Sequence, residues 1–188
     1  MENKLNSADK VILGIDPGTN IMGYGLISIH KKKISLLAMG AIQLSKYDSH
    51  SLRLKKIFER TVQLLKDYKV DEMAVEAPFY GKNAQSMLKL GRAQGVAMAA
   101  SLLREVPVVE YMPKKIKKSI TGSGSASKEQ VAAMLKSIVP FKETPKILDA
   151  TDGLAVAVCH YFQSDSPSST KGYGSWDSFL RKNPDRKA

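Results

Sequence analysis

Four carboxylates stand where predicted strands end or a predicted helix begins, and acids gathered at such places are suited to binding a divalent cation. Asp16 and Glu76 each follow a short apolar run typical of a buried strand. Asp149 opens a helix-like stretch, and Asp152 follows three residues later. Clustered acids repel one another, so a fold that brings them together is expected to bring a metal ion as well.

The same acids also have ordinary structural explanations. Asp16, with the proline and glycine that follow it, fits a tight turn in which the carboxylate accepts backbone N–H groups. Glu76 fits a capping or solvated acid at the mouth of a strand. Asp149 and Asp152 fit the first turn of a helix, where the dipole favours negative charge. Each position alone leaves both interpretations open, and only the set of four favours a metal site.

The predicted elements would bring these acids to one place. If the strand that ends at Glu76 pairs beside the strand that ends at Asp16, the two residues lie about 4.8 Å apart, close enough to share a metal. Asp149 and Asp152 share one helical face. Acids at the carboxyl ends of strands project into the crevice where α/β sheets bind ligands.

Five strands and several helices are expected from the apolar patterns. Strands are predicted over 11–16, 24–29, 34–44, 72–76 and 106–112, and helices over 51–68, 83–104, 128–139 and 148–162, with another from residue 113. The first three strands form an antiparallel meander, and the later ones, separated by helices, run parallel. The fold class is therefore α/β, a mixed five-stranded sheet flanked by helices. The small residues of the helix 83–104, which are Gly91, Ala93, Gly95 and Ala97, are expected to permit close packing.

The chain has 29 lysines and arginines against 18 acids, a formal net charge of +11 that favours a polyanion such as nucleic acid. Lys114, Lys115, Lys117 and Lys118 crowd the start of one predicted helix, and Lys128 opens the next after a glycine-serine loop. Lysines at helix starts suit phosphate groups, although a solvated helix face explains the same pattern.

The length of 188 residues fits one domain over 11–163, with flexible ends over 1–10 and 164–188. No apolar run approaches the ~18 residues of a membrane helix, and the polar start has no signal core, so no membrane association and a cytoplasmic location are expected. The single cysteine, Cys159, cannot form an intrachain disulfide. In the tail, Trp176, Phe179 and Leu180 also fit a short docking turn.

Taken in order, these motifs resemble the RuvC family of bacterial Holliday-junction resolvases. The resemblance spans about residues 11–162 and rests on four stretches of the sequence: 14–25, 76–79, 122–128 and 149–157. It implies a ribonuclease H-like fold, which agrees with the element order inferred from the patterns. It also implies a homodimer in which each subunit cuts one of two opposed strands of a four-way DNA junction, leaving 5′-phosphate and 3′-hydroxyl ends.

The resemblance assigns the catalytic and metal-binding roles to Asp16, Glu76, Asp149 and Asp152, with Mg²⁺ as the expected ion and Mn²⁺ as an alternative. Four carboxylates balance the charge of two divalent ions, which would grip the scissile phosphate about 3.5–4 Å apart. Asp16, on the central strand, is the expected shared ligand.

The DNA contacts implied by the resemblance are three. Lys117 and Lys128 match basic residues close to the cut phosphate, and Phe79 matches an aromatic residue that stacks against unpaired bases at the crossover. A buried loop phenylalanine is the alternative for Phe79. The family works with the RuvA and RuvB branch-migration proteins, which are therefore the implied partners.

Two other functions fit parts of the sequence. One is a different ribonuclease H-like nuclease, acting on RNA or on another DNA structure. The other is an ATP-binding module, because residues 14–19 also resemble the first phosphate loop of the actin, sugar-kinase and Hsp70 group. Those proteins need two such domains, and 188 residues leave no room for a second. His30, His50 and His160 lack metal-ligand spacing and are interpreted as structural.

Overall fold

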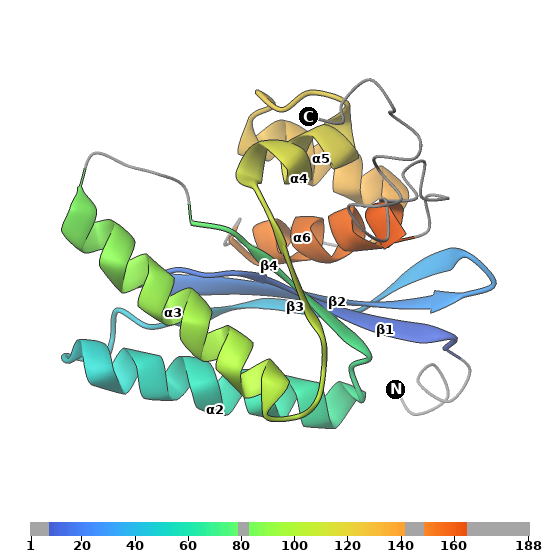
Figure 1. Cartoon of the computed structure of the whole chain (residues 1–188). Coiled ribbons are helices and arrows are strands. Elements are labelled where there is room, and N and C mark those ends of the chain that lie inside the picture. Colours follow the sequence, from blue (N-terminus) through green and yellow to red (C-terminus); the bar gives the residue numbers. More distant parts are fainter. Residues whose placement is uncertain (1–7, 79–82, 142–148, 165–188) are drawn as a thin grey trace, which may run out of the picture.

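The structure, a computed structural model, describes residues 8–78, 83–141 and 149–164 (Figure 1). Its strands are β1 Lys10–Asp16, β2 Ile21–His30, β3 Lys33–Gln43, β4 Glu72–Glu76 and β5 Val108–Tyr111. Its helices are α2 His50–Tyr68, α3 Ala84–Leu102, α4 Pro113–Thr121, α5 Lys128–Ile138 and α6 Asp149–Ser164.

β1 lies at the centre of one mixed sheet whose order is β3-β2-β1-β4-β5. It pairs antiparallel with β2 and parallel with β4. In that register Ile15 faces Val75, so the next residues, Asp16 and Glu76, end their strands at the same edge of the sheet. The predicted element order, antiparallel meander and mixed five-stranded sheet are confirmed.

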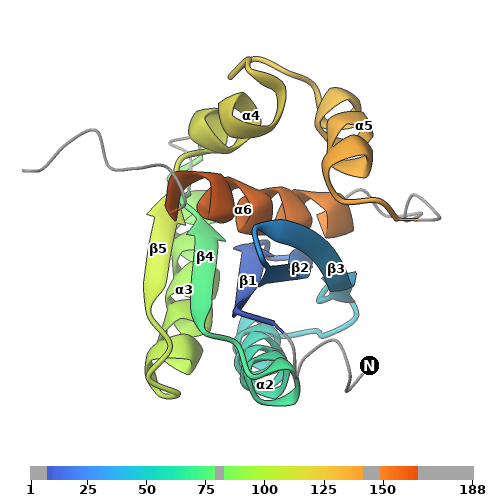
Figure 2. The same cartoon turned by 90° about the vertical axis from the view of Figure 1, so that its right-hand side faces the viewer.

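Helices cover both faces of the sheet, with α2 and α3 on one face and α4, α5 and α6 on the other (Figure 1). Figure 2 shows α6 lying directly on the sheet, with α4 and α5 farther out. Because successive side chains of a strand point to opposite faces, β1 contributes to the hydrophobic cores on both faces of the sheet. Ile12 is buried on the α6 side, and Leu13 and Ile15 are buried on the α2 side. The start of α6 is thereby held over the end of β1.

Glycines let α6 approach the sheet at backbone distance. A Cβ atom on Gly14 or Gly23 would overlap the backbone of α6, and one on Gly25 would overlap Leu154. On the facing helix, a Cβ on Gly153 would collide with the backbone of β2 at Tyr24. The first turn of α6, which carries two of the four acids, therefore sits as close to β1 and β2 as a helix can.

The close packing predicted for the small residues of α3 is confirmed for Ala93 and Ala97 and wrong for Gly91 and Gly95. A Cβ on Gly91 or Gly95 would meet no atom within 4 Å, so these two glycines face open space. The residues of α3 that pack against α2 and the sheet are alanines, Ala93 and Ala97, both fully buried. A glycine-rich helix sequence indicated small residues but not which side of the helix they occupy.

Some predictions concern residues that the structure does not describe. The expected flexible ends fall largely on residues 1–7 and 165–188, and the docking turn at 176–180 lies in the second of these ranges. The described chain is already part of the sheet at Asp9, whose N–H donates to the carbonyl of Ile29 at 2.8 Å. Among the helices described, none is both long enough and apolar enough to span a bilayer.

Candidate active site

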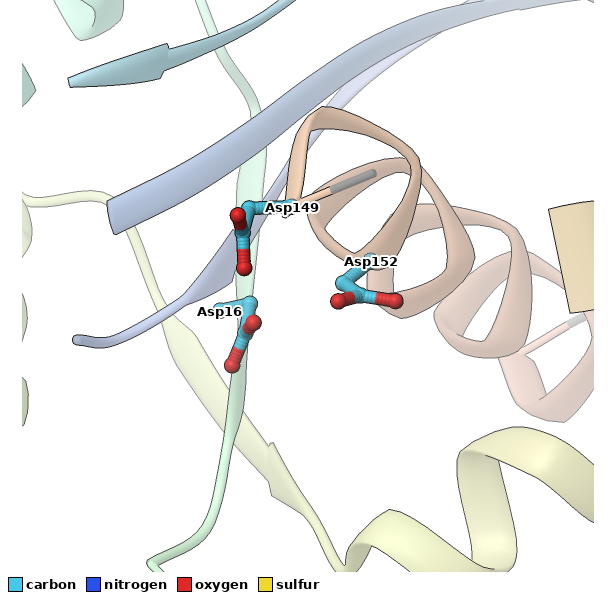
Figure 3. A group of neighbouring side chains, drawn as sticks. All are labelled: Asp16, Asp149 and Asp152. Carbon is cyan, nitrogen blue, oxygen red and sulfur yellow. The ribbon is translucent and has the colours of Figure 1, made fainter. Parts of the chain in front are cut away.

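Three aspartates meet where the end of β1 faces the first turn of α6. Carboxylate oxygens of Asp16, Asp149 and Asp152 all lie within 4.8 Å of one another. Figure 3 shows the Asp149 and Asp152 side chains leaving the helix on the side of Asp16. Oxygen ligands at such spacing suit a hard divalent cation, which takes several carboxylates in a flexible arrangement.

Glu76 lies in the same pocket but outside this group of three. Together with Asp16 and Asp152 it lines a hollow closed on the other side by α4 and α5. The remaining lining residues are Pro113, Ile116, Lys117, Lys128, Val131 and Ala155. The sequence-predicted acids are therefore in one place, with three in mutual reach and the fourth facing the same pocket.

Burial and mutual repulsion favour the protonated forms of Asp16 and Glu76. Burial, then the charges of Glu76 and Asp152, raise the pKa of Asp16 well above its usual range. Burial, then the charge of Asp152, raise the pKa of Glu76 from 4.5 to about 7. A site that disfavours the ionised form of its own carboxyl groups in this way is stabilised by a bound cation, which takes the place of the protons.

These shifts predict that the metal-free protein loses stability as pH rises. Between about pH 4.5 and 7 folded Glu76 keeps a proton that the unfolded chain has released, so the unfolding free energy falls over that interval, by about 3 kcal/mol for this group. Asp16 adds to the loss in the same direction. Thermal unfolding in EDTA between about pH 5 and 8 measures this loss of stability.

Glu76→Gln is the matched variant for that titration, because glutamine keeps the shape and cannot ionise. Its melting temperature should fall less than that of the unmodified chain over the same pH interval. An equal fall in both proteins would show that Glu76 titrates normally and would remove the basis for a strained acid cluster.

Two lysines place positive charge on this pocket. Lys128, the first residue of α5, forms a close ion pair with Asp152, and its Nζ atom lies 3.8 Å from Asp149. A capping box at Ser127 and Gln130 fixes the start of that helix. Lys117 reaches the pocket from α4. Burial lowers the pKa of Lys128, but its hydrogen bond to Asp152 and the acidic charges outweigh this and raise it.

Arg53 of α2 is a positioning residue that the sequence did not reveal. Its Nη1 donates to the carbonyl of Thr19 at 3.0 Å and to Oδ1 of Asn20 at 2.8 Å. Its Nε donates to the carbonyl of Tyr47 at 2.9 Å. One guanidinium thus ties the loop after Asp16 to the segment before α2. Nothing in the local pattern distinguishes this arginine from the other charged residues of the helix.

Arg53→Ala should lower the rate of the reaction at this site about tenfold. This factor is the lower end of the loss of activity seen when a group that orients a metal-ligand residue is removed. Because the loop after Asp16 would loosen, the metal concentration for half-maximal rate should rise as well. Guanidinium ions should partly restore the alanine variant. Lys55→Ala, on the exposed side of the same helix, is the control and should behave as the unmodified chain does.

The sequence also drew attention to His160, Cys159 and Phe79. His160 is buried in α6, with Nδ1 2.8 Å from the Tyr111 hydroxyl and Nε2 2.7 Å from a Glu72 carboxylate oxygen, which agrees with a structural role. Cys159 is a buried free thiol. Phe79 lies outside the described residues, so its stacking role stays a prediction.

Comparison with known sequences gives one consistent family. A family model described as crossover junction endodeoxyribonuclease RuvC matches residues 12–160. The crossover junction endodeoxyribonuclease RuvC of Cytophaga hutchinsonii is 58% identical over 185 residues, which cover 98% of this chain and 92% of the relative. The protein of that name from Christiangramia forsetii is 59% identical over 183 residues, covering 97% and 95%.

Solved structures give the same picture. T. thermophilus RuvC, in complex with Holliday junction substrate, matches with a TM-score of 0.76 at 31% identity, covering 82% of this chain and 94% of that chain. The yeast mitochondrial Holliday junction resolvase Ydc2 matches with a TM-score of 0.61 over 85% of this chain and 84% of its own. At 14% identity, that second match supports the shared fold alone. The ribonuclease H-like fold class expected from the sequence is confirmed.

Proposed function

The chain belongs to the RuvC family of crossover junction endodeoxyribonucleases, and from that premise we infer that it resolves Holliday junctions by cutting DNA at the acidic pocket. The observation that carries the inference is the meeting of Asp16, Asp149 and Asp152 within 4.8 Å. A pocket that combines these acids with two lysines suits a phosphodiester, because it can bind both cations and phosphate oxygens.

We propose that Mg²⁺, with Mn²⁺ as an alternative, is held by Asp16, Glu76, Asp149 and Asp152, and that two ions bind. The residues fit such ions: all four offer oxygen ligands, and burial and neighbouring acids raise the pKa of Asp16 and of Glu76 even though two lysines are nearby, so a cation among them would be stabilising. When bound, the ions supply an activated water and neutralise charge on the leaving oxygen.

The roles of the other residues follow from their positions. Lys117 and Lys128 would bind oxygens of the scissile phosphate, which is supported by their lining the pocket, one from α4 and one from the start of α5. Lys128 now pairs with Asp152, so cations that neutralise the acids would free its ammonium group for the DNA. Strand cutting here would leave 5′-phosphate and 3′-hydroxyl ends.

Further parts of this function are proposed because the chain belongs to this family. Phe79 would stack against unpaired bases at the crossover. The chain would act as a cytoplasmic homodimer that makes paired nicks, with RuvA and RuvB as partners.

A cleavage assay on three substrates tests the proposed function. A four-way junction, a linear duplex and an RNA–DNA hybrid of matched sequence would each be incubated with the protein, with Mg²⁺ and with EDTA. The junction alone should be cut into nicked duplexes, and only with Mg²⁺. Preferential cutting of the hybrid would favour another ribonuclease H-like nuclease, and cutting in EDTA would contradict the metal mechanism.

A further inference from the structure

A second basic surface lies on the far side of α4 from the catalytic pocket. It is a hollow between α4 and the end of α6, here named the outer lysine hollow. Its lining residues are Lys114, Lys115, Lys118, Ser119, Gly124 and Gln163. Lys117 on the same helix lines the catalytic pocket, so α4 forms a wall shared by the two hollows.

The lysines of the outer hollow are exposed and held on a fixed element. Ile116 and Ile120 bury the inner side of α4, at 3% and 5% exposure, so the helix cannot turn its lysines away. Within the described residues no ion pair involves Lys114, Lys115 or Lys118, and no acid lines the hollow. Among the described residues of the lining, every charged group is therefore positive.

Such an arrangement is unfavourable for the protein alone. Lys114 and Lys118 are four residues apart on the helix, and Lys115 and Lys118 are three apart, so like charges lie side by side and repel each other. A polyanion that spans the hollow removes this repulsion. The side-chain amide of Gln163 adds a neutral hydrogen-bond donor of the kind used on phosphate oxygens, whereas the Ser119 hydroxyl donates to the carbonyl of Ile116 at 2.8 Å.

We propose that the outer lysine hollow binds the sugar-phosphate backbone of a duplex arm of the junction as the arm leaves the catalytic pocket. This inference rests on the proposed function, because the DNA that reaches the hollow is the DNA held at the acids. Gln163 lies eleven residues beyond Asp152 on α6, about 16 Å along the helix. At 3.4 Å per base pair, the end of the hollow at Gln163 lies about five base pairs from the cut phosphate.

The first test compares two triple variants that remove the same charge. One carries Lys114→Gln, Lys115→Gln and Lys118→Gln; the control carries Lys31→Gln, Lys32→Gln and Lys33→Gln, in the exposed turn between β2 and β3 at the opposite end of the sheet from Asp16. Junction binding would be measured in EDTA from about 50 to 200 mM salt.

The variant of the outer hollow should bind junctions more weakly and lower the slope of log affinity against log salt by about two to three, whereas the control should change it by less than one. At saturating enzyme its single-turnover cleavage rate should stay within about threefold of the unmodified chain, because the catalytic pocket is intact. Equal effects of the two variants would overturn the inference, and so would an unchanged salt slope.

A second test locates the contact on the DNA. Neutral methylphosphonates would replace single phosphates along each arm of the junction. Neutralisation about four to six nucleotides from the cut should weaken binding of the unmodified chain and have little further effect on the outer-hollow variant. Equal losses in both proteins would show that another surface contacts those phosphates. Failure of the unmodified chain to cut junctions at all would instead refute the proposed function.

Discussion

Asp16→Asn should abolish junction cleavage, lowering the rate about a thousandfold or more, the factor that corresponds to several kcal/mol of lost metal stabilisation. Asparagine keeps the shape of the side chain but removes the charge that a shared metal ligand must supply. Junction affinity in EDTA should change less than about threefold, because the lysines proposed to contact DNA are untouched. Cleavage and binding would be measured on the same synthetic four-way junction.

The stability of this variant gives an independent readout. Because burial and neighbouring acids raise the pKa of Asp16, the metal-free asparagine variant should be more stable than the unmodified chain above neutral pH. Asp67→Asn, on the exposed side of α2, is the control and should leave both cleavage and stability unchanged. Loss of cleavage together with loss of folding would instead indicate that Asp16 serves the turn that follows β1.

Gly23→Ala should lower the cleavage rate about a hundredfold although it changes no metal-ligand residue. A misplacement of catalytic groups by about 1 Å can reduce a rate by that factor. The new Cβ would overlap the carbonyl oxygen of Asp149, so the first turn of α6 must shift away from β2 and carry Asp149 and Asp152 with it. Overpacking of this kind also destabilises the fold by about 1–3 kcal/mol. Cleavage rate and thermal unfolding would be measured together.

Gly40→Ala is the matched control for that variant. It places the same methyl group in the neighbouring strand β3, where the Cβ would meet the hydroxyl end of the Tyr24 side chain rather than the backbone of a helix. That side chain can move aside, so cleavage should stay near the rate of the unmodified chain. If both alanine variants cut equally well, the glycine contact beneath α6 does not set the position of the acids.

Local patterns were sufficient to predict the sheet and the acidic edge. The apolar run before Asp16 marks β1, and the short run before Glu76 marks β4, because a buried central strand has few polar residues on either face. The chain reaches β4 from the antiparallel meander through the helix α2, which is the kind of crossover that parallel strands use. The neighbouring positions of Asp16 and Glu76 follow from that pairing.

Other features depend on contacts between distant segments, and the sequence did not reveal them. The turn predicted after Asp16 concerned Pro17 and Gly18 and gave no role to Gly23 and Gly25, which face α6, more than a hundred residues away in the chain. The glycines of α3 looked equally suited to packing and face open space. The role of Arg53 depends on two backbone carbonyls and one side chain brought together by folding.

Anomalous X-ray scattering from a crystal of this protein grown with Mn²⁺ would test most directly whether the carboxylates hold the ions required for cutting. Manganese peaks should lie among Asp16, Asp149 and Asp152, within reach of Glu76, and should vanish in Asp16→Asn. Finding manganese elsewhere, or none at these carboxylates, in a protein that cuts junctions with Mn²⁺ would contradict the metal site proposed for this fold.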